Sequence, residues 1–232
     1  MKWLGLDPDS HGQRLQADPA PRIPSGTESA VRGSIGFALV SFAGFGPWVF
    51  AGRAFYKAVG EVGLYLACLV AFLAVSGPAL QSLILGRRNL GRAYGLFTIS
   101  FFAYAILWSV VWFAMAKPAG TKTAEWIASL AGTAAMTWVI LKAFKATDHY
   151  AIIWMALFVG HSAGYFAGDF LHNWARSHSA AELLTSMDKA GRAQLGRALW
   201  GLAYGLGFGA GIGIAWHAAQ STVRMKLNPP KS

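Results

Sequence analysis

The chain has 232 residues, of which 55% are hydrophobic and 13% are charged, and its formal net charge is +10. Several apolar runs without internal lysine or arginine extend for about 20 residues, the length that a helix needs to cross the hydrocarbon of a bilayer. This pattern excludes an ordinary soluble domain. Because the basic residues lie between the runs and form no known nucleic-acid module, a nucleic-acid-binding protein is excluded as well.

The first 31 residues are rich in proline and polar residues, a composition that cannot bury enough apolar surface to fold alone. We predict a loosely ordered cytoplasmic extension that rests on the membrane through Trp3 and Leu4. Two aspartates and a proline interrupt its start, so the usual pattern of a cleavable signal peptide is not present. The membrane domain is expected to cover residues 32–220, and residues 221–232 form a short basic tail.

Six spans are predicted, each an apolar run bounded by charged or turn-forming residues. They cover approximately Gly33–Ala51, Val62–Leu85, Ala93–Ala116, Ala124–Leu141, Tyr150–Trp174 and Arg197–Ala219. Between the fifth and sixth spans, the segment from Ala181 to Ala190 has helical periodicity and predicts an amphipathic helix at the membrane interface. The sequence therefore predicts an all-α bundle of six transmembrane helices.

An even number of spans places both termini on the same side of the membrane. By this assignment twelve lysines and arginines lie on the side of the termini and eight lie on the opposite side. The excess predicts cytoplasmic termini in the inner (plasma) membrane of a bacterial-type cell. The basic connections are expected to contact anionic lipid headgroups.

The second and third spans carry residues that bear on function. Cys68, the single cysteine of the chain, lies within the second span and is expected to be a small buried residue. Gly77-Pro78 interrupts the same span, as happens at transporter binding sites and in ordinary kinked helices.

The third span has an aromatic stripe at helical spacing, made of Phe97, Phe101, Tyr104, Trp108 and Trp112. Such a stripe is typical of helix packing and also fits an aromatic constriction on a solute path.

Glycines recur at four-residue intervals in the last two spans, a glycine-zipper pattern that lets helices approach closely. In the sixth span they are Gly201, Gly205, Gly209 and Gly213. In the fifth span they are Gly160, Gly164 and Gly168. We expect the two strips to pack on each other, and the pattern is equally compatible with a homo-oligomer or with helices of a partner in a membrane complex.

Polar residues gather in the stretch Gly160–His172 of the fifth span. At the 100° per residue of a helix, His161, Tyr165 and His172 share one face, and Asp169 lies about 80° from His161. A charged group inside a span is costly, so these side chains are expected to face the protein interior or water. They are candidates for the lining of a solute path.

Alternative interpretations of this stretch stay open. The polar face can line a hydrated path along which a titrating group couples solute to proton movement. His161 can instead ligate haem or chlorophyll in an accessory subunit of an electron-transfer or photosynthetic complex. Asp169 and His172 can also be ordinary solvated residues near the interface, and the chain can be a scaffold for helix packing. The motifs of hydrolases and metal enzymes are absent, so no enzyme and no metal site are predicted.

One part of the chain resembles a known transporter family. Gln81 is followed by Gly91-Arg-Ala-Tyr94-Gly95 and then by Tyr104-Ala-Ile-Leu-Trp108. This order is similar to the junction of the second and third spans in the acetate/succinate uptake transporter family, although that family's Asn-Pro-Ala-Pro-Leu-Gly signature is missing. The resemblance implies an oligomeric six-span channel for small monocarboxylates, with Gln81, Tyr104 and Trp108 on the solute path. We therefore expect a channel or transporter for a small solute or anion.

Overall fold

The computed structural model describes residues 1–17 and 23–227, and every regular element in these ranges is a helix. Six of the helices are long and apolar enough to cross a membrane. They are α2 (Gly26–Phe50), α3 (Gly52–Leu80), α4 (Leu90–Ala119), α5 (Thr121–Phe144), α6 (Tyr150–Ala175) and α8 (Lys189–Ala219). The prediction of an all-α membrane protein with six spans is confirmed.

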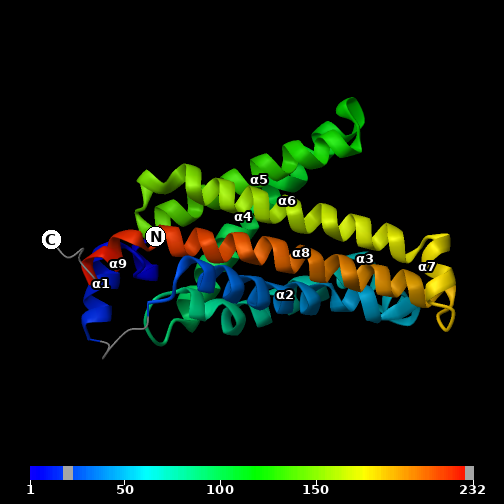
Figure 1. The fold of residues 1–232 in the computed structure, drawn as a ribbon, viewed down its shortest axis with the longest axis horizontal. Coiled ribbons are helices and arrows are strands. Elements are labelled where there is room, and N and C mark those ends of the chain that lie inside the picture. The colour runs from blue at the N-terminus through cyan, green and yellow to red at the C-terminus, as the bar shows by residue number, and fades with distance from the viewer. Residues whose placement is uncertain (18–22, 228–232) are drawn as a thin grey trace.

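The six long helices form a ring. Neighbouring helices follow the order α2, α3, α4, α5, α6 and α8, and α8 closes the ring against α2. The first helices, η1 (Lys2–Leu4) and α1 (Pro8–Gln16), and the last described helix, α9 (Ser221–Leu227), lie at one end of the bundle, which we call the terminal end, and α7 (His178–Leu183) lies at the opposite, far end (Figure 1). The other short elements of the terminal end are η2 (Gln81–Leu83) and η3 (Thr147–His149).

One face of α8 packs against α2 through glycines. A Cβ atom at Gly209 would collide with the carbonyl oxygen of Gly33, and one at Gly213 would collide with that of Ser29. The two backbones approach closely because these positions have no side chain. The glycine strip that the sequence analysis singled out in the last span is therefore covered by α2.

The glycine strip of α6 packs against another face of α8. A Cβ atom at Gly160 would lie 2.6 Å from the carbonyl oxygen of Gly207 and 2.9 Å from Gly211. The strip does contact the last span, as expected, but the expected partner face, Gly201–Gly213, was wrong. Residues two positions apart on a helix point about 200° apart. One glycine-rich helix therefore serves two neighbours, which a single four-residue spacing did not reveal.

The prediction of a loosely ordered N-terminal extension is wrong for its described part. The carboxylate of Asp7 caps α1 by accepting a hydrogen bond from the backbone nitrogen of Ser10, at 3.2 Å. Leu6 and Leu15 are buried against the end of the bundle. The bundle supplies the apolar surface that this segment lacks on its own, which composition alone did not show. Residues 18–22 of this extension, and residues 228–232 of the predicted C-terminal tail, lie outside the described residues.

The connection between the fifth and sixth spans also differs from the prediction. The helix expected at the membrane interface is limited to the six residues of α7, and α8 begins at Lys189 instead of near Arg197. The hydroxyl of Ser177 caps α7, and the carboxylate of Asp188 caps α8 by accepting from the backbone nitrogen of Gly191. These caps set the helix starts, and a search for apolar runs does not detect them.

Candidate solute-binding site

Three phenylalanines close the interior of the ring towards the terminal end. Phe37, Phe97 and Phe208 are fully buried. The ring centroid of Phe37 lies 5.8 Å from that of Phe97 and 5.4 Å from that of Phe208. We call these three residues the aromatic plug. It separates the terminal end from the polar groups that lie further along the same helices.

A short chain of polar groups crosses the interior beyond the plug. The hydroxyl of Tyr204 on α8 donates to the hydroxyl oxygen of Tyr104 on α4 at 3.4 Å, and the oxygen of Tyr104 lies 2.6 Å from Nε2 of His161 on α6. Since Tyr104 accepts from Tyr204, it is assigned as the donor to Nε2, which places the proton of a neutral imidazole on Nδ1. Nδ1 is buried and has no hydrogen-bond partner among the described residues.

Aromatic rings hold His161 in place. The ring of Tyr165, one turn further along α6, stacks on the imidazole with centroids 5.7 Å apart and planes inclined by 16°. Phe208 and Tyr204 meet the imidazole edge to face, at 5.1 and 5.6 Å. His161 and Tyr165 thus lie on one inward face, where the sequence placed them, and His161 is completely buried.

Two cavities lie in series between this cluster and the far end. The inner cavity has a volume of about 250 Å³ and is lined by Phe45, Phe72, Phe101, Tyr104, Trp108, Tyr165, Trp200 and Tyr204. The outer cavity has a volume of about 380 Å³ and is lined by Phe45, Trp48, Leu64, Tyr65, Cys68, Asp169, His172 and Trp200. Phe45 and Trp200 line both cavities and contact each other edge to face, with ring centroids 5.0 Å apart. The two cavities therefore share a wall made by this pair.

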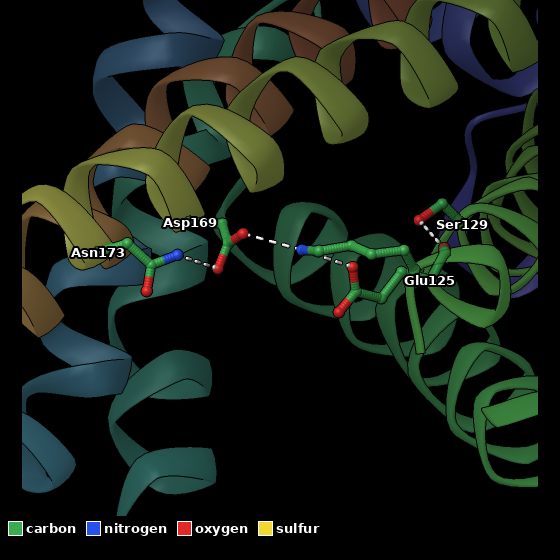
Figure 2. A network of polar contacts seen from close by, with 5 residues as sticks. Glu125, Ser129, Asp169 and Asn173 are labelled. Carbon is green, nitrogen blue, oxygen red and sulfur yellow. Dashed lines mark hydrogen bonds and ion pairs between the residues drawn. The ribbon is translucent and has the colours of Figure 1, made fainter. Parts of the chain in front are cut away.

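Asp169 does not join the His161 cluster. It accepts a hydrogen bond from Nζ of Lys122 on α5 at 2.9 Å and another from the amide of Asn173 at 3.3 Å. Lys122 also forms an ion pair with Glu125, at 3.2 Å, so that one ammonium group bridges two carboxylates across the gap between α5 and α6 (Figure 2). This network joins the two helices near the far end and forms part of the rim of the outer cavity.

Glu125 and Tyr204 are site residues that the sequence analysis did not single out. Glu125 is a buried carboxylate within a predicted span, and its spacing of three residues from Lys122 is the signal that could have identified it. Tyr204 lies among the glycines of α8, where no periodic polar pattern surrounds it. Its role depends on which helix it faces, and that information is not contained in its own span.

The remaining predicted path residues fall in three places. Trp108 lines the inner cavity beside Tyr104. His172 lines the outer cavity, and its Nε2 atom lies 3.3 Å from a guanidinium nitrogen of Arg176. Gln81 lies at the terminal end, where its amide donates to the carbonyl oxygen of Pro78 at 3.4 Å. The structure thus brings Tyr104 and Trp108 to the fifth-span cluster and leaves Gln81 apart from it.

Comparison with known proteins gives no assignment. No family model, no curated protein and no solved structure matches this chain. Within residues 1–17 and 23–227, no group of three or more histidine, cysteine, aspartate or glutamate side chains is arranged to hold a metal ion. We therefore infer a function from the cavities and the polar chain.

Proposed function

We propose that this chain is a membrane transporter or channel that binds a small uncharged solute inside the helix ring. The observation that carries the proposal is the pair of cavities in series, which leads from the far end to the hydrogen bond between Tyr104 and His161. Ligand sites of this kind are concave, mostly apolar and furnished with a few placed polar groups.

The lining of the inner cavity points to an uncharged solute. All eight of its lining residues are aromatic, and their polar atoms are tyrosine hydroxyls and the indole nitrogens of Trp108 and Trp200. An anion in this cavity would lose its hydration without gaining a cationic partner from the lining, which is strongly unfavourable. The protonated form of a short monocarboxylic acid fits better than its anion. Such an acid still belongs to the class of solutes that the transporter resemblance implies, the small monocarboxylates.

The shape of the path supports a transporter with access from one end at a time. The aromatic plug closes the terminal end, whereas the outer cavity lies towards the far end. Between the two cavities stands the pair of Phe45 and Trp200, which has to separate before a solute passes. A continuous open pore would show neither of these barriers.

The competing interpretations gain less support. Ligation of haem or chlorophyll by Nε2 of His161 would require the bond to Tyr104 to break. A second histidine ligand from α8 would have to be His217, which lies at the end of that helix with Nδ1 at 3.3 Å from the hydroxyl of Ser29. A scaffold for partner helices would need exposed glycine faces, but the glycine strips of α6 and α8 are covered within the chain. Assembly into a homo-oligomer stays a prediction.

The single cysteine offers a direct test of the path. Cys68 lines the outer cavity, so a membrane-impermeant methanethiosulfonate reagent added at the far end is expected to modify it and to block solute uptake. A Cys68→Ser variant should transport normally and resist the reagent. A transported solute should slow the modification of wild-type Cys68, which turns the same assay into a screen for the solute.

Uptake into proteoliposomes tests the site itself. We expect a short monocarboxylate from a panel of small solutes to enter faster than into empty liposomes, and faster at lower pH because the neutral acid is then more abundant. His161→Ala should slow this uptake by about tenfold or more, because Tyr104, which lines the inner cavity, would lose the hydrogen bond that orients its hydroxyl towards a solute. Asp169→Asn, at the rim, should have a smaller effect. Uptake equal to that of empty liposomes for the whole panel, with Cys68 inert from both sides, would overturn the proposal.

A further inference from the structure

A separate, strongly basic cavity lies at the terminal end. It has a volume of about 560 Å³ and is lined by Arg14, Leu15, Ala17, Gly86, Arg87, Arg88 and Arg92. Four of these seven residues are arginines, and none of the described lining residues carries a carboxylate. A smaller hollow of about 290 Å³ shares Arg88 and Arg92 with it and adds Trp3. We call the larger cavity the arginine pocket.

The loop before α4 is built to a defined shape. The buried side-chain amide of Asn89 donates to the carbonyl oxygens of Ile84, Leu85 and Gly86, at 2.8, 3.0 and 2.9 Å. Arg88 has a φ of 54°, in the left-handed region that residues other than glycine seldom occupy. The backbone that carries the arginines is therefore fixed by the bonds from Asn89, and Nη1 of Arg92 adds a bond of 3.2 Å to the carbonyl oxygen of Arg88.

Helix α1 completes the pocket from the other side. Its His11 places Nε2 at 3.1 Å from the carbonyl oxygen of Leu85, which holds α1 over the loop. Arg14, one turn further, donates through Nη1 to the carbonyl oxygen of Gly5 at 3.4 Å. The Nε and Nη2 atoms of Arg14 are buried and have no hydrogen-bond partner among the described residues. Arg92 is positioned by a bond of 3.1 Å from its Nε to the carbonyl oxygen of Leu4.

The arginine pocket contains N–H groups of Arg14 without a hydrogen-bond partner among the described residues, and the positive charges of Arg14 and Arg92 repel each other. Burial, and after it the positive charge of Arg92, lower the pKa of Arg14 to about 10, so Arg14 remains charged at neutral pH. A buried N–H without a partner and a like charge nearby both cost free energy. A bound anion with several oxygens removes both costs, and the planar guanidinium fork matches the geometry of phosphate oxygens.

We propose that the arginine pocket binds a phosphate group, supplied by an anionic phospholipid headgroup or by a soluble phosphate ester. The pocket lies at an end of the membrane bundle, and the indole of Trp3 beside it is 69% exposed, as is common for tryptophan at the level of lipid headgroups. This site lies on the opposite side of the aromatic plug from the solute cavities, so the proposal does not depend on the transport function.

The experiment uses the full chain in nanodiscs of phosphatidylcholine and follows its thermal unfolding in a phosphate-free buffer. One arm titrates inorganic phosphate, and the other replaces part of the lipid by phosphatidylglycerol. We expect at least one arm to raise the unfolding temperature of the wild type. Arg14→Gln is expected to weaken the apparent affinity by about tenfold or more, as for loss of a charge-assisted hydrogen bond. Lys142→Gln, which removes an exposed charge at the same end, is expected to respond as the wild type does.

A second variant guards against a folding defect. The Arg88 side chain is exposed and forms no hydrogen bond or ion pair with another described residue, and asparagine tolerates the left-handed conformation, so Arg88→Asn should fold normally yet respond weakly. A shift with inorganic phosphate alone identifies a soluble ester as the source, and a shift with phosphatidylglycerol alone identifies a lipid. The proposal is overturned if neither arm stabilises the wild type, or if Arg88→Asn responds like Lys142→Gln.

Discussion

Tyr104 is the side chain through which three helices share their polar contacts. Its hydroxyl accepts from Tyr204 and contacts Nε2 of His161, and the whole residue is buried among aromatic rings. In such surroundings a hydrogen bond is difficult to replace, because no water is available to either partner. The position of His161 beside the inner cavity therefore depends on a hydroxyl from another helix.

Replacement of Tyr104 by phenylalanine should destabilise the protein. Nε2 of His161 and the hydroxyl of Tyr204 would both lose their partner, at a cost of about 1–3 kcal/mol in the free energy of unfolding. Tyr150→Phe is the matched control, because this tyrosine is 42% exposed and keeps its ring contact with Trp154. Denaturant unfolding in mild detergent measures the difference. Equal stability of the two variants would contradict the assigned hydrogen-bond chain.

His11 should make the attachment of α1 sensitive to pH. The pKa of His11 is lowered to about 4, first by burial and then by the positive charges of Arg14 and Arg92, against the opposing effects of the Leu85 carbonyl and Asp7. The unfolded histidine titrates near 6.5, so the folded state is favoured above that pH and loses stability as the pH falls towards 4. Between pH 7 and pH 5 the loss should be about 2 kcal/mol.

The measurement for His11 is the unfolding temperature of the wild type relative to that of a His11→Gln variant at several pH values. The glutamine amide can still donate to the Leu85 carbonyl but does not titrate, so the two curves should diverge below about pH 6.5. Parallel curves down to pH 5 would show that protonation of His11 does not loosen the structure.

The sequence can predict which residues of one span share a face, but it cannot predict which residues of different spans are in contact. The helical period alone placed His161 and Tyr165 on one face, because both belong to the same helix. It could not show that Tyr104 reaches His161 while Asp169 turns to Lys122, since these contacts depend on which helices are neighbours. His11 was overlooked for a similar reason, because its burial comes from the loop before α4 and not from its own segment.

At the level of the elements, α8 is the centre of the packing. It contacts both α2 and α6 through backbone, since glycines face each neighbour. Close backbone approach of this kind replaces the larger side-chain contacts of a soluble core, because lipid supplies no hydrophobic driving force between helices. Tyr204 and Trp200, which belong to the same helix, are thereby held at a fixed depth beside the cavities.

Substitutions of glycine should have opposite effects at two positions. In Gly209→Ala the new methyl group would collide with the carbonyl oxygen of Gly33 and with Phe37, so α2 has to move away, at a cost of about 1–3 kcal/mol or more. Gly46, on α2, has open space around it, and Gly46→Ala should be neutral or stabilise the helix by up to about 1 kcal/mol. Unfolding of both variants in detergent checks the signs. Two variants of equal stability would contradict the close α2–α8 contact.

The elements themselves were largely predictable, since an apolar run of membrane length has few alternatives to a helix. The errors lie where polar residues extend a helix beyond the apolar run. α2 begins at Gly26 behind the cap of Ser25, seven residues before the predicted Gly33, and α8 begins behind Asp188. Capping side chains and helical turns outside the hydrocarbon determine these ends, and hydropathy is insensitive to both.

For the whole molecule, the two ends of the bundle differ in chemistry. The terminal end holds the arginine pocket and the folded N-terminal segment, and the outer cavity and the network of Lys122 lie towards the far end (Figure 1, Figure 2). The excess of basic residues predicts that the terminal end faces the cytoplasm. Solute would then enter the cavities from outside the cell.

Thiol labelling of intact cells can test this orientation. In a Cys68→Ser background, Ser179→Cys places an exposed thiol on α7 at the far end, and Thr147→Cys places one on η3 at the terminal end. An impermeant maleimide should label the first variant in intact cells and the second only after lysis. The reverse pattern would show that the terminal end faces outward.

The backbone contacts of α8 also have a kinetic consequence. They tie α2, α8 and α6 together through backbone, whereas the ribbon of the α4–α5 hairpin diverges from the other helices at its tip, where the side chain of Lys122 reaches Asp169 of α6 (Figure 1). Phe45 and Trp200, which separate the two cavities, both belong to helices of the tied group. We therefore expect this pair to separate by rotation of its side chains, with little displacement of the helices. Passage between the cavities should therefore be faster than collective helix motions, which take about microseconds to milliseconds.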